Sequence, residues 1–145
     1  MTALEILIDL LKRFEGLRLN AYLCPAGVPT IGYGETLGVK MGDVWTMEQS
    51  QDKLKHRAGQ FLRATINRCP QLANEPAARQ AACASLAYNI GVGAFEASSV
   101  SRHTQRREYA SAANSFLLWN KGGGKVLPGL TSRRKIERDY FLIGF

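Results

Sequence analysis

The sequence predicts an α+β fold in which a small β lobe and a larger helical lobe are joined by one long helix. Apolar residues repeat at helical spacing through most of the chain, whereas residues 18–35 alternate with a period of two around a turn. With 145 residues, of which 46% are hydrophobic, one globular unit is expected to bury roughly 68 to 70% of its unfolded surface. We therefore expect a single domain over residues 1–145.

The N-terminal segment, residues 1–14, is predicted to be an amphipathic helix packed on the helical lobe. Its apolar residues recur at helical spacing: Leu4, Leu7, Ile8, Leu11 and Phe14. A signal peptide or membrane anchor is the alternative, but Glu5 and Asp9 interrupt the apolar run and no basic region precedes it. The run is also too short to cross a bilayer, so we expect no stable membrane insertion.

Residues 15–45 are predicted to form the β lobe. Side chains alternate along 19–23, residues 24–27 (Cys-Pro-Ala-Gly) have turn chemistry, and the β-prone stretch 28–34 is punctuated by glycine, which together indicate a hairpin. Residues 38–45 are expected to add a short third strand or a loop.

Residues 46–68 are predicted to be the long connecting helix, because Thr46 and Gln49 have the spacing of a capping box and the apolar stripe continues to Cys69-Pro70. Residues 69–145 are assigned to the helical lobe. Helices are expected over about 75–90, 98–105, 107–120 and 132–142, with the glycines at 122–124 as a helix stop and loop.

The cysteines and the net charge limit the kinds of site and partner that we expect. Cys24, Cys69 and Cys83 are odd in number and lack zinc-ligand spacing, so we expect reduced thiols, no metal and no cofactor, with Cys69 and Cys83 buried. The net charge of +7 favours polyanionic partners but does not choose among nucleic acid, anionic lipid and cell-wall polymer. Nine Lys or Arg occur over residues 102–138, and a solvated helix face accounts for them equally well.

Three polar residues stand out in the otherwise apolar, glycine-rich segment 14–36. Glu15 ends an apolar helix, where partial burial of the carboxyl would favour the neutral form that a general acid requires. Cys24 lies in a hairpin turn, where an exposed thiol can act as nucleophile or base, although most single cysteines are packing residues. Thr30 is on a strand, where threonine is usually just a β former.

The spacing of these residues, Glu-x8-Cys-x5-Thr with PTIGYGET, resembles the catalytic motif of the phage-type lysozymes, the endolysins of glycoside hydrolase family 24. Further resemblance lies in AYNIGVGAF (87–95), AANSFLLWNKGGGK (112–125) and LPGLTSRRKIERDYF (127–141), so it covers most of the chain in the family's order. The family usually has Asp where this chain has Cys24, and the resemblance is to the subset with cysteine there. The implied fold is lysozyme-like, with the site in a cleft between the lobes.

The resemblance implies hydrolysis of the β-1,4 bond between N-acetylmuramic acid and N-acetylglucosamine in peptidoglycan, with host cell lysis as the result. Glu15 would be the acid, Cys24 either a base or a nucleophile, and Thr30 would position water. Arg133 falls where a family arginine pairs with the catalytic Glu. Gly32 and Tyr33 are assigned to the cleft or its support. Glu35 departs from the usual His, which puts the packing of the β lobe in question.

The resemblance also implies a monomer that acts on the peptidoglycan glycan strand, stays in the host cytoplasm and reaches the cell wall when a holin opens the membrane. Two other functions are weighed against it. A non-hydrolytic cell-wall binder or membrane-perturbing protein would use the basic charge and amphipathic helices such as 133–145. A nucleic-acid binder would use the charge alone, and no DNA- or RNA-binding motif accompanies it.

Overall fold

The structure, a computed structural model, describes residues 1–143 and confirms the α+β class. Helix α1 (Ala3–Glu15) begins with a capping box between Thr2 and Glu5 that the sequence analysis did not predict. Its buried residues are Ile6, Leu7, Leu10 and Leu11. The predicted amphipathic helix is confirmed, and Leu4, Ile8 and Phe14 of the predicted stripe pack against the same core while remaining partly exposed.

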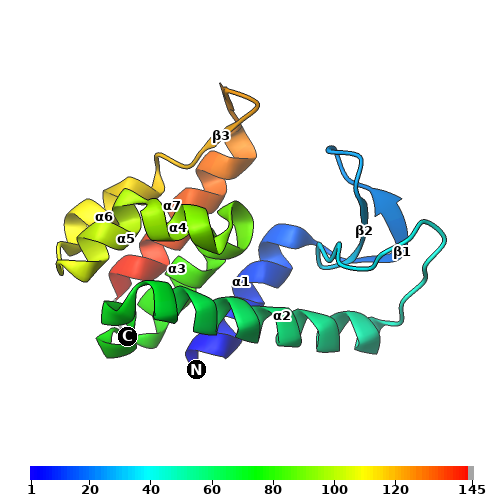
Figure 1. The fold of residues 1–145 in the computed structure, drawn as a ribbon, viewed down its shortest axis with the longest axis horizontal. Coiled ribbons are helices and arrows are strands. Elements are labelled where there is room, and N and C mark those ends of the chain that lie inside the picture. The colour runs from blue at the N-terminus through cyan, green and yellow to red at the C-terminus, as the bar shows by residue number, and fades with distance from the viewer. Residues whose placement is uncertain (144–145) are drawn as a thin grey trace.

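The β lobe is built on an antiparallel hairpin of β1 (Arg18–Leu23) and β2 (Pro29–Gly32), with Tyr22 paired to Thr30 and an irregularity between Arg18 and Tyr22. The segment after β2 makes only isolated bridges, Ile31 to Glu35 and Asn20 to Val44. Residues 38–45 are thus a loop that touches the edge of β1. Figure 1 shows this lobe on one side of the molecule, connected to the rest by α1 and by the long helix that follows residue 46.

Helix α2 (Met47–Arg68) is the long connecting helix. The predicted capping box is confirmed, since the Thr46 hydroxyl accepts from the Gln49 N–H while the Gln49 side chain accepts from the Thr46 N–H. The helix ends at Cys69, and the short 3-10 helix η1 (Pro70–Asn74) turns the chain into the helical lobe.

Helix α3 (Ala77–Ile90) is the centre of the helical lobe and packs against α1, α2 and the C-terminal helix α7 (Pro128–Ile143). Its small residues from Ala81 to Ala87 are all buried, which lets three neighbouring helices approach it closely. Both remaining thiols, Cys69 and Cys83, are fully buried, as predicted.

The rest of the lobe contains α4 (Val92–Ala97), α5 (Ser99–Gln105), α6 (Tyr109–Phe116), the two-residue strands β3 (Lys121–Gly122) and β4 (Lys125–Val126), and α7 (Pro128–Ile143). Helix α4 was not predicted from the sequence, and α7 begins four residues before its predicted start. The loop predicted at 122–124 is the turn of the β3–β4 hairpin. No helix within residues 1–143 is long and apolar enough to span a membrane.

Candidate active site

Glu15 is the last residue of α1, and its carboxylate lies between the two lobes of the chain. The helix stops there because Gly16 adopts φ 65°, a conformation that a residue with a side chain rarely takes. Oε1 accepts a hydrogen bond of 3.0 Å from Arg133 Nη1 of α7. On the β-lobe side, a Cβ atom added to Gly34 would lie 3.0 Å from Oε2, so only glycine leaves the carboxylate its space. The Glu15 side chain keeps 22% of its surface exposed.

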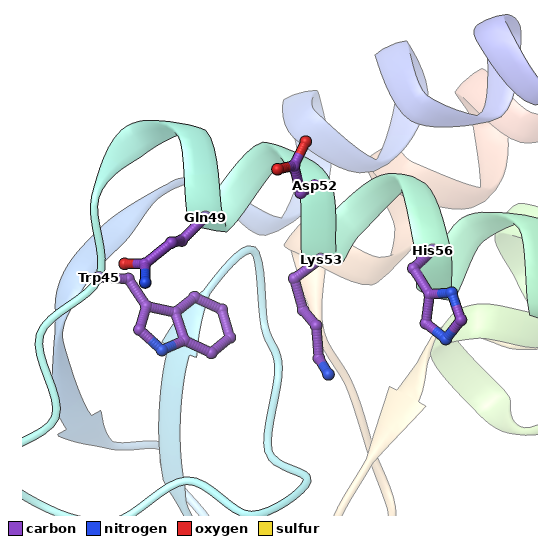
Figure 2. A pocket seen from close by; sticks show the side chains of 5 residues that line it. All are labelled: Trp45, Gln49, Asp52, Lys53 and His56. Carbon is purple, nitrogen blue, oxygen red and sulfur yellow. The ribbon is translucent and has the colours of Figure 1, made fainter.

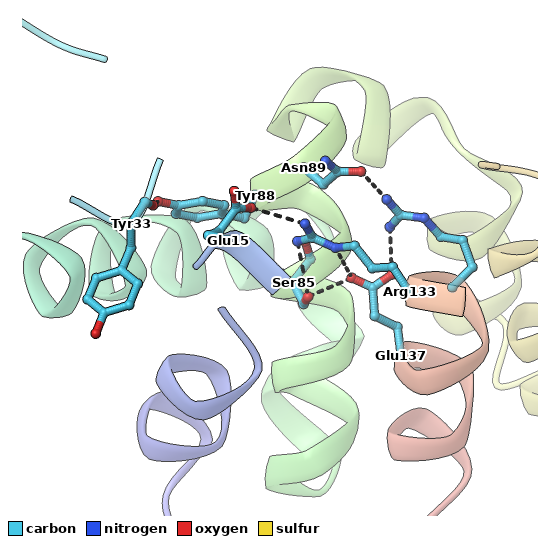
Figure 3. A network of polar contacts seen from close by, with 8 residues as sticks. Glu15, Tyr33, Ser85, Tyr88, Asn89, Arg133 and Glu137 are labelled. Atoms are coloured by element: carbon cyan, nitrogen blue, oxygen red, sulfur yellow. Dashed lines mark hydrogen bonds and ion pairs between the residues drawn. The ribbon is translucent and has the colours of Figure 1, made fainter. Parts of the chain in front are cut away.

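Arg133 is buried and uses all three guanidinium nitrogens. Besides Nη1, which binds Glu15, Nε donates to Glu137 at 3.2 Å and Nη2 donates to the Ser85 carbonyl at 3.1 Å. The guanidinium also stacks over the Phe14 ring, 4.6 Å from its centre. Figure 3 shows it reaching from α7 toward Glu15, so it is fixed from several sides.

Behind Arg133 lies a second layer of charge that the sequence analysis missed. Glu137 has no exposed surface and accepts hydrogen bonds of 2.5 Å from the Ser85 hydroxyl and from Arg134 Nη1. Arg134 is also fully buried and donates to the Trp119 carbonyl and to Asn89. The interpretation of the late basic residues as a solvated helix face was wrong for this pair of arginines. The sequence RRKIE on a helix does not distinguish these buried arginines from arginines in exposed ion pairs.

Tyr88 of α3 connects the helical lobe to the β lobe beside Glu15. Its hydroxyl donates to the Tyr33 carbonyl at 3.3 Å, and its ring packs on Phe61 of α2 with centres 4.9 Å apart. Burial, reinforced by the negative charges of Glu15 and Glu35, raises the pKa of Tyr88 to about 12. Tyr88 therefore remains neutral at physiological pH.

Cys24 and Thr30 lie together at the hairpin turn. The Gly27 N–H donates to the Cys24 carbonyl at 2.8 Å, closing a turn in which Gly27 has φ 78°. The Val28 carbonyl accepts from both the Cys24 N–H at 3.0 Å and the Thr30 hydroxyl at 2.8 Å. Since Thr30 pairs with Tyr22, Cys24 is its diagonal neighbour on the same face of the hairpin.

The environment of Cys24 favours the thiolate. A hydrogen bond from the Val28 backbone is the largest cause that lowers the pKa of the Cys24 thiol; the backbone at Ala26 and Gly27 and the Thr30 side chain add to it, and partial burial opposes it. The other two thiols behave oppositely, because burial raises the pKa of Cys69 and of Cys83. Among the described thiols, Cys24 is thus both the most accessible and the most easily ionised.

The other two assigned residues, Gly32 and Tyr33, hold the β lobe in place. A Cβ atom on Gly32 (φ +67°) would lie 2.8 Å from the Trp45 ring, so this glycine lets the indole pack on the hairpin. The Tyr33 side chain is 9% exposed and belongs to the core formed with α1, α2 and α3. Neither side chain makes a described hydrogen bond to Glu15, Cys24 or Thr30.

Glu35, which replaces the usual histidine, is buried against α2. Its carboxylate faces Arg57 Nε at 3.4 Å and Lys53 Nζ at 3.8 Å, and its backbone exchanges two 2.9 Å hydrogen bonds with Ile31. The carboxylate is thus held mainly by charge, because Glu35 Oε1 and Arg57 Nε make no hydrogen bond within residues 1–143. Two cations on α2, Lys53 and Arg57, therefore compensate the charge of Glu35 where the β lobe packs on this helix.

A surface depression of about 430 Å³ lies along the same helix. Figure 2 shows its lining residues: Trp45, Gln49, Asp52, Lys53 and His56. Gln49, Lys53 and His56 point from the same side of α2 because they follow each other by four and three positions, whereas Asp52 points from the opposite side of the helix in this view. In the part of the chain that the structure describes, no group of three or more His, Cys, Asp or Glu residues is placed to hold a metal ion.

The chain is similar to known proteins in both sequence and structure. The model of the phage lysozyme family matches residues 12–137. A curated relative, an endolysin of Acyrthosiphon pisum secondary endosymbiont phage 1, is 39% identical over 138 residues, covering 91% of this chain and 92% of its own length.

Two solved structures are similar over nearly the whole fold. An endolysin from Escherichia coli O157:H7 phage FAHEc1 has a TM-score of 0.83 at 31% identity and covers 98% of this chain and 94% of its own. The muramidase domain of SpmX from Asticaccaulis excentricus has a TM-score of 0.83 at 31% identity, with 94% of both chains covered.

Proposed function

Because this chain belongs to the phage lysozyme family, we propose that Glu15, Cys24 and Thr30 are its catalytic residues and that Cys24 places it in the subset with cysteine instead of the usual aspartate. The chain is an endolysin, a lysozyme that cleaves peptidoglycan and so lyses the host cell. Its target is the β-1,4 bond between N-acetylmuramic acid and N-acetylglucosamine.

Glu15 is the proton donor in this proposal, and its position carries the argument. A glycosidic oxygen is a poor leaving group until it is protonated, so the acid must be held still and partly shielded from water. The Glu15 side chain meets both needs, since it is 22% exposed and fixed by Arg133 on one side and confined by Gly34 on the other.

Cys24 supplies the second function. Its lowered pKa increases the fraction of thiolate, which either takes a proton from the attacking water or attacks the anomeric carbon itself. The first route inverts the anomeric configuration and the second retains it, so the configuration of the first product distinguishes them.

Thr30 positions the water in the first of these routes. Its single hydroxyl proton is donated to the Val28 carbonyl, which leaves the oxygen lone pairs free to accept a hydrogen bond. An accepted hydrogen bond from water would orient that water beside the Cys24 sulfur.

The test is the release of new reducing ends from purified peptidoglycan. Glu15→Gln should abolish the release, Cys24→Ser should nearly abolish it, and Cys24→Asp should retain part of it. Glu96→Gln is the matched control, because Glu96 is half exposed and pairs with Arg68 on the surface, so wild-type activity is expected. If Glu15→Gln released reducing ends as fast as wild type, the assignment of the acid would be wrong.

We propose one lysozyme domain over residues 1–145, with the β lobe at 15–45 and the helical lobe at 69–145. It acts as a monomer on the glycan strand, accumulates in the host cytoplasm and reaches the wall through a holin lesion. The basic surface concentrates it on an acidic polymer and needs no nucleic acid and no membrane insertion. Killing that survived Glu15→Gln would favour a membrane-perturbing protein instead.

A further inference from the structure

Glu137 is a buried acid that the proposed mechanism does not use, and it lies directly behind the arginine that binds Glu15. Arg133 Nη1 donates to Glu15 and Arg133 Nε donates to Glu137, so one guanidinium links an acid of the reaction to an acid of the core (Figure 3). Glu137 has no exposed surface, whereas Glu15 is partly exposed. The two carboxylates therefore compete for the same positive charge.

Glu137 is surrounded by cations from α7 and by polar side chains from α3. From its own helix, α7, it faces Arg133 and Arg134; from α3 it faces the Ser85 hydroxyl and the thiol of Cys83. Burial raises the pKa of Cys83 well above its ordinary value, so this thiol is neutral and adds no charge. Two guanidinium groups and a hydroxyl donor thus contact the buried carboxylate of Glu137.

Within residues 1–143, one cation contacts Glu15. Arg133 binds it from α7, the Gly34 backbone confines it from the β lobe, and Tyr88 of α3 is neutral because its pKa is about 12. Glu35 also acts on Tyr88, but its own ion pairs are with Lys53 and Arg57 of α2. The attraction between Glu15 and Arg133 therefore depends on how much of the Arg133 charge Glu137 offsets.

We infer that Glu137 is a positioning residue that orients Arg133 and offsets its charge, so that Glu15 can still take up the proton it must deliver. The inference rests on the proposed role of Glu15 as the acid. Two effects follow from the geometry: the Nε contact fixes the direction of the guanidinium, and the buried negative charge weakens the attraction that would hold Glu15 ionised.

The test is the pH dependence of the release of reducing ends by folded variants. In Glu137→Gln the amide keeps the size of the side chain but loses the charge, so Glu15 faces an uncompensated Arg133 and loses its proton at lower pH. The alkaline limb of the pH profile is expected to move down by roughly half to one pH unit. Glu137→Asp keeps the charge, and its limb should stay near that of wild type even if the rate falls.

The matched control is Glu75→Gln. Glu75 is also a buried glutamate in an i,i+4 pair with an arginine, Arg79, and it precedes α3 at the end of that helix remote from Ser85. It should lose stability without moving the limb. Glu137→Gln with an unmoved limb would overturn the inference, because a purely structural role lowers the rate at every pH alike.

A second measurement covers the case in which Glu137→Gln does not fold. Carbon-13 NMR of the wild-type side-chain carboxyls should show Glu137 ionised throughout the pH range of activity, and protonation within that range would overturn the inference. Glu15→Gln separates the two claims. An active Glu15→Gln enzyme contradicts the proposed function, whereas an inactive one combined with an unmoved limb in Glu137→Gln contradicts only the role of Glu137.

Discussion

Gly34→Ala tests the fit of the β lobe against Glu15. Gly34 has φ +82°, and a methyl group there would lie 3.0 Å from Glu15 Oε2. The left-handed conformation costs an L residue about 1 to 2 kcal/mol, which lowers the melting temperature of a chain of 145 residues by roughly 3 to 8 °C. The carboxylate must also shift by a few tenths of an ångström away from its position against Arg133.

That shift should lower kcat about tenfold, since a displacement of about 1 Å costs up to about 100-fold. Gly38→Ala is the matched control, because Gly38 has φ +70° and a methyl group there meets no atom within 4 Å. The two variants should lose similar stability in thermal unfolding, while only Gly34→Ala loses kcat in the reducing-end assay. Equal kcat values for both variants would refute the placement of Glu15 against Gly34.

Three further outcomes are expected. Iodoacetamide should modify Cys24 with a pH midpoint below that of free cysteine, and Thr30→Val should raise that midpoint by removing one donor; a midpoint equal to that of free cysteine would contradict the described hairpin. Glu35→Gln should lower the free energy of unfolding by about 1 to 2 kcal/mol because it leaves Arg57 without its counter-ion, and urea unfolding with no loss would contradict that pairing. Burial opposes ionisation of Glu75, but hydrogen bonds and charge lower its pKa below 4.5. The free energy of unfolding lost in Glu75→Gln should therefore be constant above about pH 5 and shrink as pH falls below 4.5. A loss that grew in acid would contradict the lowered pKa.

The sequence contained enough information for the main elements of the fold. Helix α1, the hairpin and α2 follow from periodicity, turn chemistry and the Thr46 capping box, which are local signals. Ile6 and Leu10 were not part of the predicted stripe of α1, because partner helices on two sides, α2 and α3, bury them as well as Leu7 and Leu11. Short elements such as α4 were missed because six residues give no periodic pattern.

The charged layer behind the site was not predictable from local patterns. Glu15 and Arg133 are 118 positions apart, and only the family resemblance connected them. Burial of Arg134 and Glu137 depends on α3 presenting Ser85 and Asn89 to α7, which no residue spacing reveals. The proximity of Cys24 and Thr30 was easier to predict, because a tight turn brings residues six positions apart close together.

The most direct test of the central claim is whether Glu15 and Cys24 serve the same bound glycan. In Glu15→Gln, which should bind substrate without cleaving it, the rate of Cys24 alkylation is measured with and without a saturating peptidoglycan fragment, with binding confirmed by calorimetry. We expect the bound fragment to slow alkylation at least severalfold. An unchanged alkylation rate under saturation would place the thiol outside the glycan site and contradict the account.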